Sequence, residues 1–282
     1  MNESPSSETV LAEECRIMDL YAPHYRSNTL TNSWPYQVER TQFADWVLAT
    51  TTGAGIRPAQ ALVLDVGCGT GEVPELLRQR GFERLMGVDA APRMIEEARR
   101  NLPNALFIHE AIDRVLDVGE PVQIVTAAFT VHHLLQPRSF FELVDRVLAP
   151  GGWFFLLEYN RHSWSRRPTL SPLLLAPARP LRVLLKLKNR RRLAGLHDLP
   201  ALFNPAHRLL SFDEIVDSMP EPTGYELRRV TRGLWLPSLK HALSGESSFD
   251  RALVRMIGAA ERTLLPAGAG HFQWIAGRRL TD

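Results

Sequence analysis

The sequence is poor in cysteine: Cys15 and Cys68 are the only two among 282 residues. Two distant cysteines form neither a disulfide framework nor a metal-binding cluster, and they fit a reducing compartment. The sequence also lacks a run of about 18 apolar residues, which a membrane-spanning helix needs. Its polar first residues have neither the basic nor the apolar stretch of a signal peptide. We therefore expect a cytoplasmic protein without a metal site.

An excess of charge of one sign is missing as well. The formal net charge is only +2, which is too small to indicate a nucleic-acid partner. Hydrophobic residues make up 45% of the chain, enough for a packed core and too many for a wholly disordered chain. The length fits one large domain with additions.

What the chain does have is an alternation of apolar runs with helical patterns. Strands separated by helices at this spacing indicate an α/β fold, a parallel sheet with helices on both faces. The predicted strands are 61–66, 84–89, 105–110, 122–129, 153–159, 224–237 and 271–280. The predicted helices are 38–48, 72–80, 92–101, 139–148, 211–218 and 249–265, with residues 1–15 expected as a flexible tail that enters a helix near its end.

The sharpest local signal is the loop Gly67-Cys68-Gly69-Thr70-Gly71, which follows a buried strand and precedes a helix. Glycines let the backbone approach a ligand without side chains in the way. A dinucleotide loop would need its third glycine at position 72, which is Glu72, and that carboxylate is unfavourable beside a pyrophosphate. The loop therefore favours a ligand without phosphates, and a plain strand-turn-helix corner is the alternative.

Acidic residues end the next two predicted strands. Asp89 at the end of the second strand can accept hydrogen bonds from the vicinal hydroxyls of a ribose. Its alternative role is to cap the following helix. Glu110 at the end of the third strand can accept from an adenine amino group, or it is a solvated loop carboxylate.

Four stretches in this order, VLDVGCGTG, GVDAAPRMIEEAR, AAFTVHHL and LAPGGWFFLLE, resemble the class I S-adenosylmethionine methyltransferases, most closely the ubiquinone/menaquinone-biosynthesis type. The resemblance covers about residues 60–160. It implies a Rossmann-like, seven-stranded, mostly parallel sheet with an antiparallel last strand, an N-terminal helical lid and a helical insert. It also implies S-adenosylmethionine as cofactor and a small natural-product or lipid-like acceptor, methylated at O, N or C. The alternatives are an NAD(P)-binding oxidoreductase, which Glu72 disfavours, and an inactive methyltransferase-like binding protein.

The resemblance further implies which residues contact the cofactor. Tyr25 would do so from the N-terminal lid, unless that segment packs away from the site. The others are Asp65, Gly67, Cys68, Gly69, Ala128 and Phe129 around the methionine portion, Asp89, Ala90 and Met94 around the adenosine, and Glu110 and Ala111 near the adenine.

Catalytic candidates follow from the chemistry of methyl transfer. The protein mainly aligns the partners and excludes water, and a base is needed only when the acceptor must lose a proton. His132 and His133 follow the fourth predicted strand, and we expect His133 to be the base if there is one. Adjacent residues point apart, so the pair is not a metal site. Glu158 either faces the acceptor or pairs with an arginine.

The region 161–192 contains ten Lys and Arg residues and no acid. Arg182, Lys186 and Arg190 share one helical face beside leucines, a pattern that fits contact with an anionic lipid surface. A cap over the acceptor and a solvated helix are the alternatives. We expect a tail and helical lid at 1–58, a cofactor-binding core at 59–160, a basic helical insert at 161–210 and the rest of the sheet at 211–282.

Overall fold

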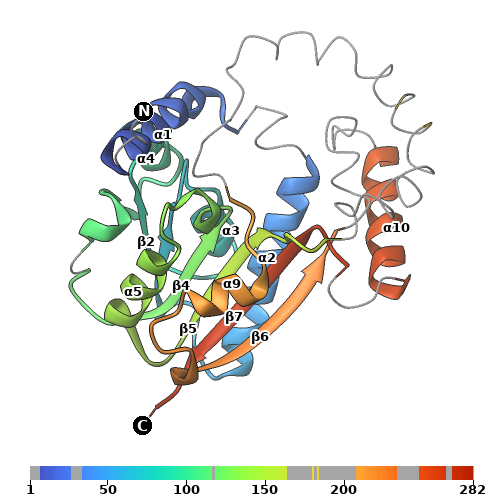
Figure 1. Cartoon of the computed structure of the whole chain (residues 1–282). Helices are drawn as coiled ribbons and strands as arrows, with labels where there is room; N and C mark the ends of the chain where they lie inside the picture. The colour runs from blue at the N-terminus through green and yellow to red at the C-terminus, as the bar shows by residue number, and fades with distance from the viewer. Residues whose placement is uncertain are drawn as a thin grey trace, which may run out of the picture.

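A computed structural model describes residues 7–26, 34–115, 118–163, 180, 183, 208–233, 248–264 and 269–281. Within them lies one seven-stranded sheet of order β3-β2-β1-β4-β5-β7-β6 (Figure 1). The pairs among β1 to β5 are parallel, and β7 is antiparallel to both of its neighbours. The sheet predicted from the sequence is therefore confirmed. The strands are β1 (Leu62–Val66), β2 (Arg84–Asp89), β3 (Leu106–His109), β4 (Val122–Ala128), β5 (Leu148–Tyr159), β6 (Tyr225–Arg232) and β7 (Phe272–Arg279).

Helices cover both faces of the sheet. Residues of α2, α3 and α4 pack in one hydrophobic cluster with the sheet, and residues of α5 and α9 pack in the other. Figure 1 shows α5 and α9 in front of the strands. The helices are α1 (Ser7–Tyr21), α2 (Trp34–Gly53), α3 (Glu72–Arg78), α4 (Pro92–Asn101), α5 (Arg138–Val147), α9 (Phe212–Asp217) and α10 (Ser248–Leu264). Short 3₁₀ turns are η1 (Ala22–His24), η2 (Ile112–Arg114), η3 (Val131–His133) and η5 (Pro222–Gly224).

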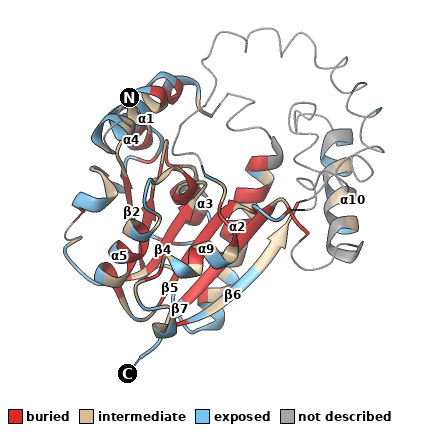
Figure 2. Cartoon of the chain, viewed as in Figure 1, coloured by how far each residue is buried: buried red, intermediate tan, exposed pale blue. Residues whose placement is uncertain are grey.

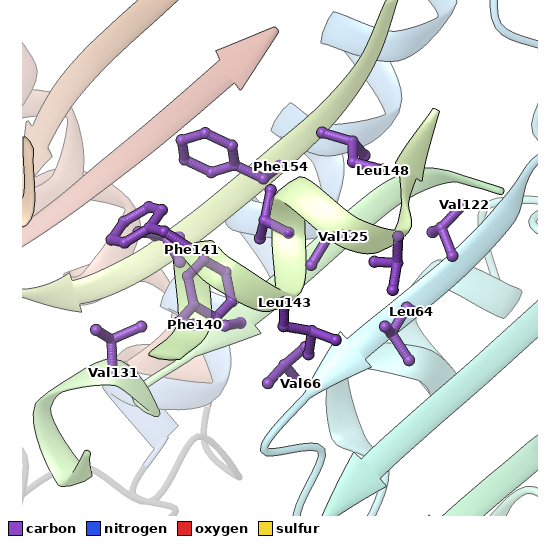
Figure 3. Close-up of a cluster of buried hydrophobic side chains, with 14 of the residues drawn as sticks. Leu64, Val66, Val122, Val125, Val131, Phe140, Phe141, Leu143, Leu148 and Phe154 are labelled. Atoms are coloured by element: carbon purple, nitrogen blue, oxygen red, sulfur yellow. The ribbon is translucent and has the colours of Figure 1, made fainter. Parts of the chain in front are cut away.

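The central strands are apolar on both faces because both faces are covered (Figure 2). Every residue of β1 is buried. In β5, Phe154 and Leu156 join the cluster on the α5 side (Figure 3), whereas Phe155 and Leu157 join the cluster on the α2 side. Each such side chain contributes about 1.5–3 kcal/mol of burial. This rigid sheet fixes the positions of the loops that follow β1, β2, β4 and β5.

The N-terminal region differs from the sequence prediction. Residues 1–15 are expected as a flexible tail that enters a helix only near its end, but α1 already begins at Ser7. Its polar sequence gives little local signal, and the helix is held by tertiary packing. Ile17 and Tyr21 pack in a small cluster with Ala91 and Met94 of the α4 region. The helix α1 consequently lies against α4, next to the end of β2.

The helix predicted at 211–218 is confirmed together with its start signal. Ser211 caps α9 by accepting from the Glu214 N–H at 3.1 Å, and the Glu214 carboxylate accepts from the Ser211 N–H at 2.8 Å. No helix of the described residues is long and apolar enough to cross a membrane. Most of the basic region 161–192 lies outside the described residues, and the boundaries at 58/59, 160/161 and 210/211 stay predictions.

Candidate active site

The glycine loop follows β1 as predicted. Gly67, Gly69 and Gly71 all have positive φ, of 66°, 52° and 85°. A Cβ on Gly67 would lie 2.3 Å from Cγ2 of Thr130, so this glycine lets the loop after β4 approach. A Cβ on Gly69 would meet nothing nearer than the Glu72 carboxylate at 3.9 Å. At Gly69, therefore, only this carboxylate lies within ordinary contact distance of the added atom.

Two predicted members of the loop region are buried rather than presented to a ligand. Asp65 accepts a hydrogen bond of 2.6 Å from the Thr126 hydroxyl on β4, and its burial raises the pKa of its carboxyl to about 8. The Cys68 side chain packs onto Gly87 of β2, since a Cβ there would lie 2.8 Å from its sulfur. Cys68 thus contributes backbone and packing, while Asp65 places an ionisable group beneath the loop.

Asp89 ends β2 beside the loop, as predicted. Its Oδ2 accepts from the Gly69 N–H and its Oδ1 from the Ala91 N–H, both at 2.9 Å. Burial raises the pKa of this carboxyl, and the two N–H donors oppose the shift. A carboxylate oxygen can accept two hydrogen bonds, so each Asp89 oxygen retains capacity for a ribose hydroxyl. The Glu110 N–H donates to the Asp89 carbonyl at 3.1 Å, which places the adenine candidates next to the ribose candidate.

Glu110 and Ala111 form a local turn. The Glu110 carboxylate accepts from the Ala111 N–H at 3.0 Å, and both residues are half-buried. Ala90 lies one residue beyond Asp89, and its carbonyl accepts from the Cys15 thiol of α1 at 3.4 Å. Asp89, Ala90, Glu110 and Ala111, predicted around the adenosine and adenine, are therefore brought together after the ends of β2 and β3.

The N-terminal segment, residues 7–26, contacts the glycine loop, α3 and α4. Arg26 donates to the Thr70 carbonyl at 2.8 Å and contacts Glu75 at 2.5 Å. The Tyr25 hydroxyl lies 3.5 Å from a guanidinium nitrogen of Arg40, and burial raises the pKa of this phenol. Met94 is buried against α1 rather than exposed toward a cofactor site. The segment lies over the predicted site, which supports its interpretation as a lid.

The end of β4 carries an aromatic group. Phe129 has a φ of 58° and is the one non-glycine with positive φ among the described residues. Such a backbone costs of order 1–3 kcal/mol and is typical of functional sites. The Phe129 ring contacts Tyr36, Tyr159 and Phe272 at centroid distances of 5.5, 5.1 and 5.5 Å. We call these four residues the aromatic cluster. The carbonyl of Ala128, the residue before Phe129, accepts a hydrogen bond from the Thr130 hydroxyl at 3.4 Å.

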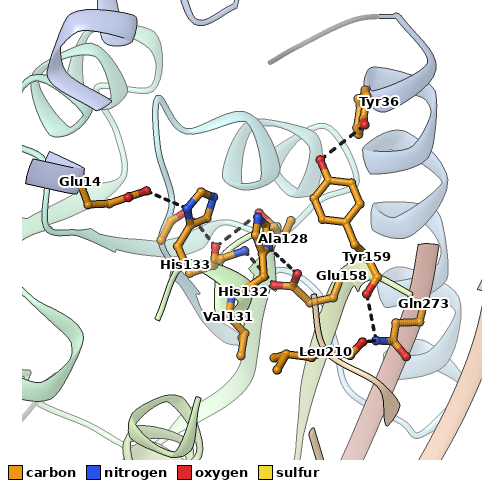
Figure 4. Close-up of polar contacts among 12 residues, drawn as sticks. Glu14, Tyr36, Ala128, Val131, His132, His133, Glu158, Tyr159, Leu210 and Gln273 are labelled. Carbon is orange, nitrogen blue, oxygen red and sulfur yellow. Dashed lines mark hydrogen bonds and ion pairs between the residues drawn. The ribbon is translucent and has the colours of Figure 1, made fainter. Parts of the chain in front are cut away.

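The two histidines after β4 have different partners (Figure 4). His132 Nδ1 lies 2.7 Å from Glu158 Oε2, and both side chains are buried. His133 Nδ1 lies 2.7 Å from Glu14 Oε1 of α1, and its side chain is more exposed. The histidine rings are 4.1 Å apart. Among the described residues, Glu158 pairs with a histidine rather than an arginine, and His133 contacts Glu14 of the N-terminal segment.

Sequence reasoning missed several contributors to this site. Thr126, Arg26 and Glu14 lie in no motif, and their partners are between 44 and 119 residues away along the chain. Only the folded sheet brings them together. A signal was available for Thr130, because it sits between Phe129 and the histidines in the quoted stretch AAFTVHHL.

These features fit the cofactor that the sequence resemblance implies. A side chain is missing at Gly69, so the backbone there is not shielded by one, and Asp89 retains acceptor capacity for vicinal hydroxyls. Acidic groups at positions 65, 72 and 89 suit a ligand that carries a positive sulfonium and an ammonium group. The same acids are unfavourable for a pyrophosphate.

Comparisons with known proteins agree with this chemistry. The methyltransferase domain family matches residues 64–156. An uncharacterised methyltransferase of Synechocystis is 31% identical over 160 residues, which cover 51% of this chain and 74% of the relative. A ubiquinone biosynthesis O-methyltransferase of Leptothrix cholodnii is 29% identical over 180 residues, covering 62% of this chain and 71% of the relative.

The fold is also shared with solved structures. A S-adenosylmethionine-dependent methyltransferase of Thermotoga maritima, described as a possible histamine N-methyltransferase, matches with a TM-score of 0.54 at 17% identity. The match covers 94% of this chain and 99% of that one. The oxidoreductase interpretation is thereby set aside. The chain belongs to the class I methyltransferases that use S-adenosylmethionine as cofactor.

Proposed function

We propose that this enzyme methylates a hydroxyl oxygen on a small acceptor that carries a flat apolar ring. The proposal rests on the aromatic cluster, which lies at the carboxyl-terminal ends of strands β4 and β5. Thr130, the residue after Phe129, lies against Gly67 of the cofactor loop. An acceptor bound on the cluster is therefore next to the cofactor, where ligands of α/β sheets bind.

The cluster has a buried base and a half-buried rim. Tyr36 and Phe272 are buried, whereas Phe129 and Tyr159 are half-buried. The strained backbone of Phe129 holds its ring at this rim. An aromatic pair contributes about 0.5–1.5 kcal/mol beyond its area burial, which favours a ring as the bound group. The Leptothrix relative is named as an O-methyltransferase, and this supports oxygen as the methylated atom.

The residues of the chain then have separate tasks. When bound, the cofactor supplies a methyl group on a positively charged sulfur, already activated for displacement. Gly69 and Asp89 hold and orient the cofactor from the ends of β1 and β2. Tyr25 and Arg26 cover that side and exclude water. Phe129 and Tyr159 orient the acceptor for in-line attack, which is the main rate contribution required of the protein.

A panel of small hydroxyl compounds, incubated with S-adenosylmethionine and analysed by mass spectrometry, tests the proposal. Phenols and catechols should gain one methyl group. Phe129→Leu keeps the positive φ but removes the ring, and it should raise the KM of ring acceptors about tenfold, or about 1.4 kcal/mol. Phe212→Leu removes a half-buried ring on α9 and serves as the matched control. Methylation of non-aromatic acids or amines alone would overturn the proposal.

We also propose that the basic region 161–192 contacts an anionic lipid surface. Its ten positive charges without an acid cannot enter the core, because burying unpaired charges costs several kcal/mol each. Val183, one of its described residues, is 58% exposed. An exposed apolar residue within a basic stretch of sequence fits the boundary between headgroups and acyl chains, and such a contact would bring the enzyme to a lipid-like acceptor.

A further inference from the structure

The His132–Glu158 pair is the most deeply buried ionisable pair beside the aromatic cluster. The side chains are 2% and 1% exposed. Glu158 ends β5, and its Oε1 accepts from the N–H groups of Val131 at 2.6 Å and Thr130 at 2.9 Å. Its Oε2 lies 2.7 Å from His132 Nδ1 (Figure 4). Glu158 thus holds both the backbone of η3 and the imidazole that η3 carries.

This contact assigns the tautomer of the imidazole. Burial alone raises the pKa of Glu158, but His132 and the two N–H donors outweigh it and hold the pKa below its usual value. An ionised carboxylate only accepts hydrogen bonds, so Nδ1 must carry the proton it shares with Glu158. Burial lowers the pKa of His132 although Glu158 opposes the shift. In its neutral form, which burial favours, the ring with Nδ1 protonated has its basic lone pair on Nε2.

His132 borders the aromatic cluster. Its ring contacts Tyr159 edge-on at 5.0 Å, and Tyr159 contacts Phe129 at 5.1 Å. Within the described part of the chain, the ionisable groups around it come from three elements: Glu158 and Tyr159 on β5, His133 on η3 and Glu14 on α1. His133, by contrast, is directed to the lid through Glu14. Of the two histidines, His132 is the one placed beside the acceptor.

We propose that His132 accepts at Nε2 the proton that a hydroxyl acceptor loses, and that Glu158 is the positioning residue that fixes the required tautomer. The inference rests on the proposed function and deepens it. The acceptor O–H bond breaks and its proton passes to Nε2. The oxygen bonds to the methyl carbon as the carbon–sulfur bond breaks, and the sulfur keeps that electron pair. The imidazolium, stabilised by Glu158, then returns the proton to water.

Acceptors differ in whether they need a base. A carboxylate acceptor is already ionised at pH 7 and needs no base, whereas a phenol of pKa about 10 is protonated. A positioned base accelerates such a proton transfer by about 10²–10⁴-fold. A buried, carboxylate-oriented imidazole at this place therefore selects a hydroxyl as the acceptor.

Glu158→Gln is the informative variant. The Gln carbonyl oxygen can still accept from Thr130 and Val131, so the loop stays anchored. Its amide NH₂ then faces His132 and donates to Nδ1, which moves the ring proton to Nε2 and removes the base. A corresponding substitution in a serine protease triad lowers turnover about 10⁴-fold by the same tautomer change. His162→Gln, at an exposed histidine after β5, is the matched control.

The first measurement needs no acceptor. Imidazole ¹⁵N–¹H spectra of histidine-labelled wild-type protein report which nitrogen of His132 carries the proton. We expect Nδ1–H in the wild type and Nε2–H in Glu158→Gln, with His132→Gln assigning the signal. Nε2–H in the wild type overturns the proposal, whether or not an acceptor has been found.

The second measurement is turnover across phenols whose pKa values run from about 7 to about 10. Glu158→Gln should lose about 10²–10⁴-fold on the weakly acidic phenols and little on those already ionised at the assay pH. S-adenosylhomocysteine affinity should not change. An equal loss on every phenol, or transfer to carboxylates alone, overturns the role of His132. Failure of the proposed function looks different: no ring compound is methylated by the wild type.

Discussion

At the scale of single residues, Asp89 carries the most chemistry. Its two oxygens already bind the Gly69 and Ala91 amides, so the side chain is rigid before any cofactor arrives. A group that is preorganised in this way loses little conformational entropy on binding. The same contacts join the end of β2 to the glycine loop, so the proposed ribose site would be positioned by both β1 and β2.

Asp89→Ala should weaken S-adenosylhomocysteine binding by about 1–3 kcal/mol, or roughly 5- to 150-fold, because ribose hydroxyls lose their acceptor. Isothermal titration calorimetry measures this. Asp113→Ala, an exposed acid on η2, should bind like the wild type. An unchanged dissociation constant in a folded Asp89→Ala protein would remove Asp89 from the ribose role.

Asp65 should link cofactor binding to pH. Burial raises the pKa of this carboxyl to about 8, and the Thr126 hydrogen bond opposes the shift, so Asp65 is mostly protonated at pH 7. A cationic ligand nearby favours the ionised form and lowers the pKa. Binding at pH 7 should then release about one proton, and affinity should rise with pH until it levels off above about 8.

The heat of binding in buffers of different ionisation enthalpy reports the proton release. Asp65→Asn cannot ionise but can keep the contact with Thr126, and it should show no release and a flat affinity profile. Identical buffer dependence in the wild type and this variant would contradict the linkage to Asp65.

At the scale of elements, strands surrounded by sheet are predictable from sequence and the N-terminal helix is not. β2 occupies 84–89 and α4 92–101 as predicted, because buried strands are continuous apolar runs and Pro92 marks a helix start. β5 begins at Leu148 rather than at the predicted residue 153, so the strand includes Pro150 and Gly151, which were expected to end the preceding helix. The early start of α1 at Ser7 was not predicted, because the helix is stabilised by packing of Ile17 and Tyr21 against α4, far along the chain.

The contact of Arg26, just after η1, with the glycine loop and α3 predicts an effect on the rate at which the cofactor dissociates. Arg26→Ala removes the half-exposed contact with Glu75 and the hydrogen bond to Thr70. Each is worth about 1 kcal/mol or less at the surface, so S-adenosylhomocysteine should dissociate about 2- to 10-fold faster in stopped-flow measurements. Arg16→Ala, which removes an exposed pair within α1, is the matched control. Equal dissociation rates in both variants would show that the segment does not retain the cofactor.

At the scale of the whole molecule, the strand order could not be read from periodicity. The apolar runs at β1 and β4 are alike, and nothing local says that they lie side by side while β3 is at the edge. The quoted stretches supplied that arrangement through the resemblance. The strand order explains why the glycine loop after β1 meets the residues after β4. It also explains why candidate residues between 65 and 158 lie together at the carboxyl-terminal ends of the parallel strands.

The composition of the basic region 161–192 predicts salt-sensitive binding to anionic vesicles. Wild-type protein should sediment with phosphatidylglycerol vesicles at low salt and be released at high salt, because each basic residue near an anionic bilayer contributes about 1 kcal/mol and salt screens it. Neutralising Arg182, Lys186, Arg190, Arg191 and Arg192 should abolish sedimentation but leave S-adenosylhomocysteine binding intact. Wild type that stays in the supernatant at low salt would contradict the lipid contact.

The most direct test of the account is titration of S-adenosylhomocysteine and NAD into the same protein by calorimetry. The glycine loop, Asp89 and the acids around them predict saturable binding of S-adenosylhomocysteine at one site per chain, and no binding of NAD. Saturable NAD binding without S-adenosylhomocysteine binding would contradict the account.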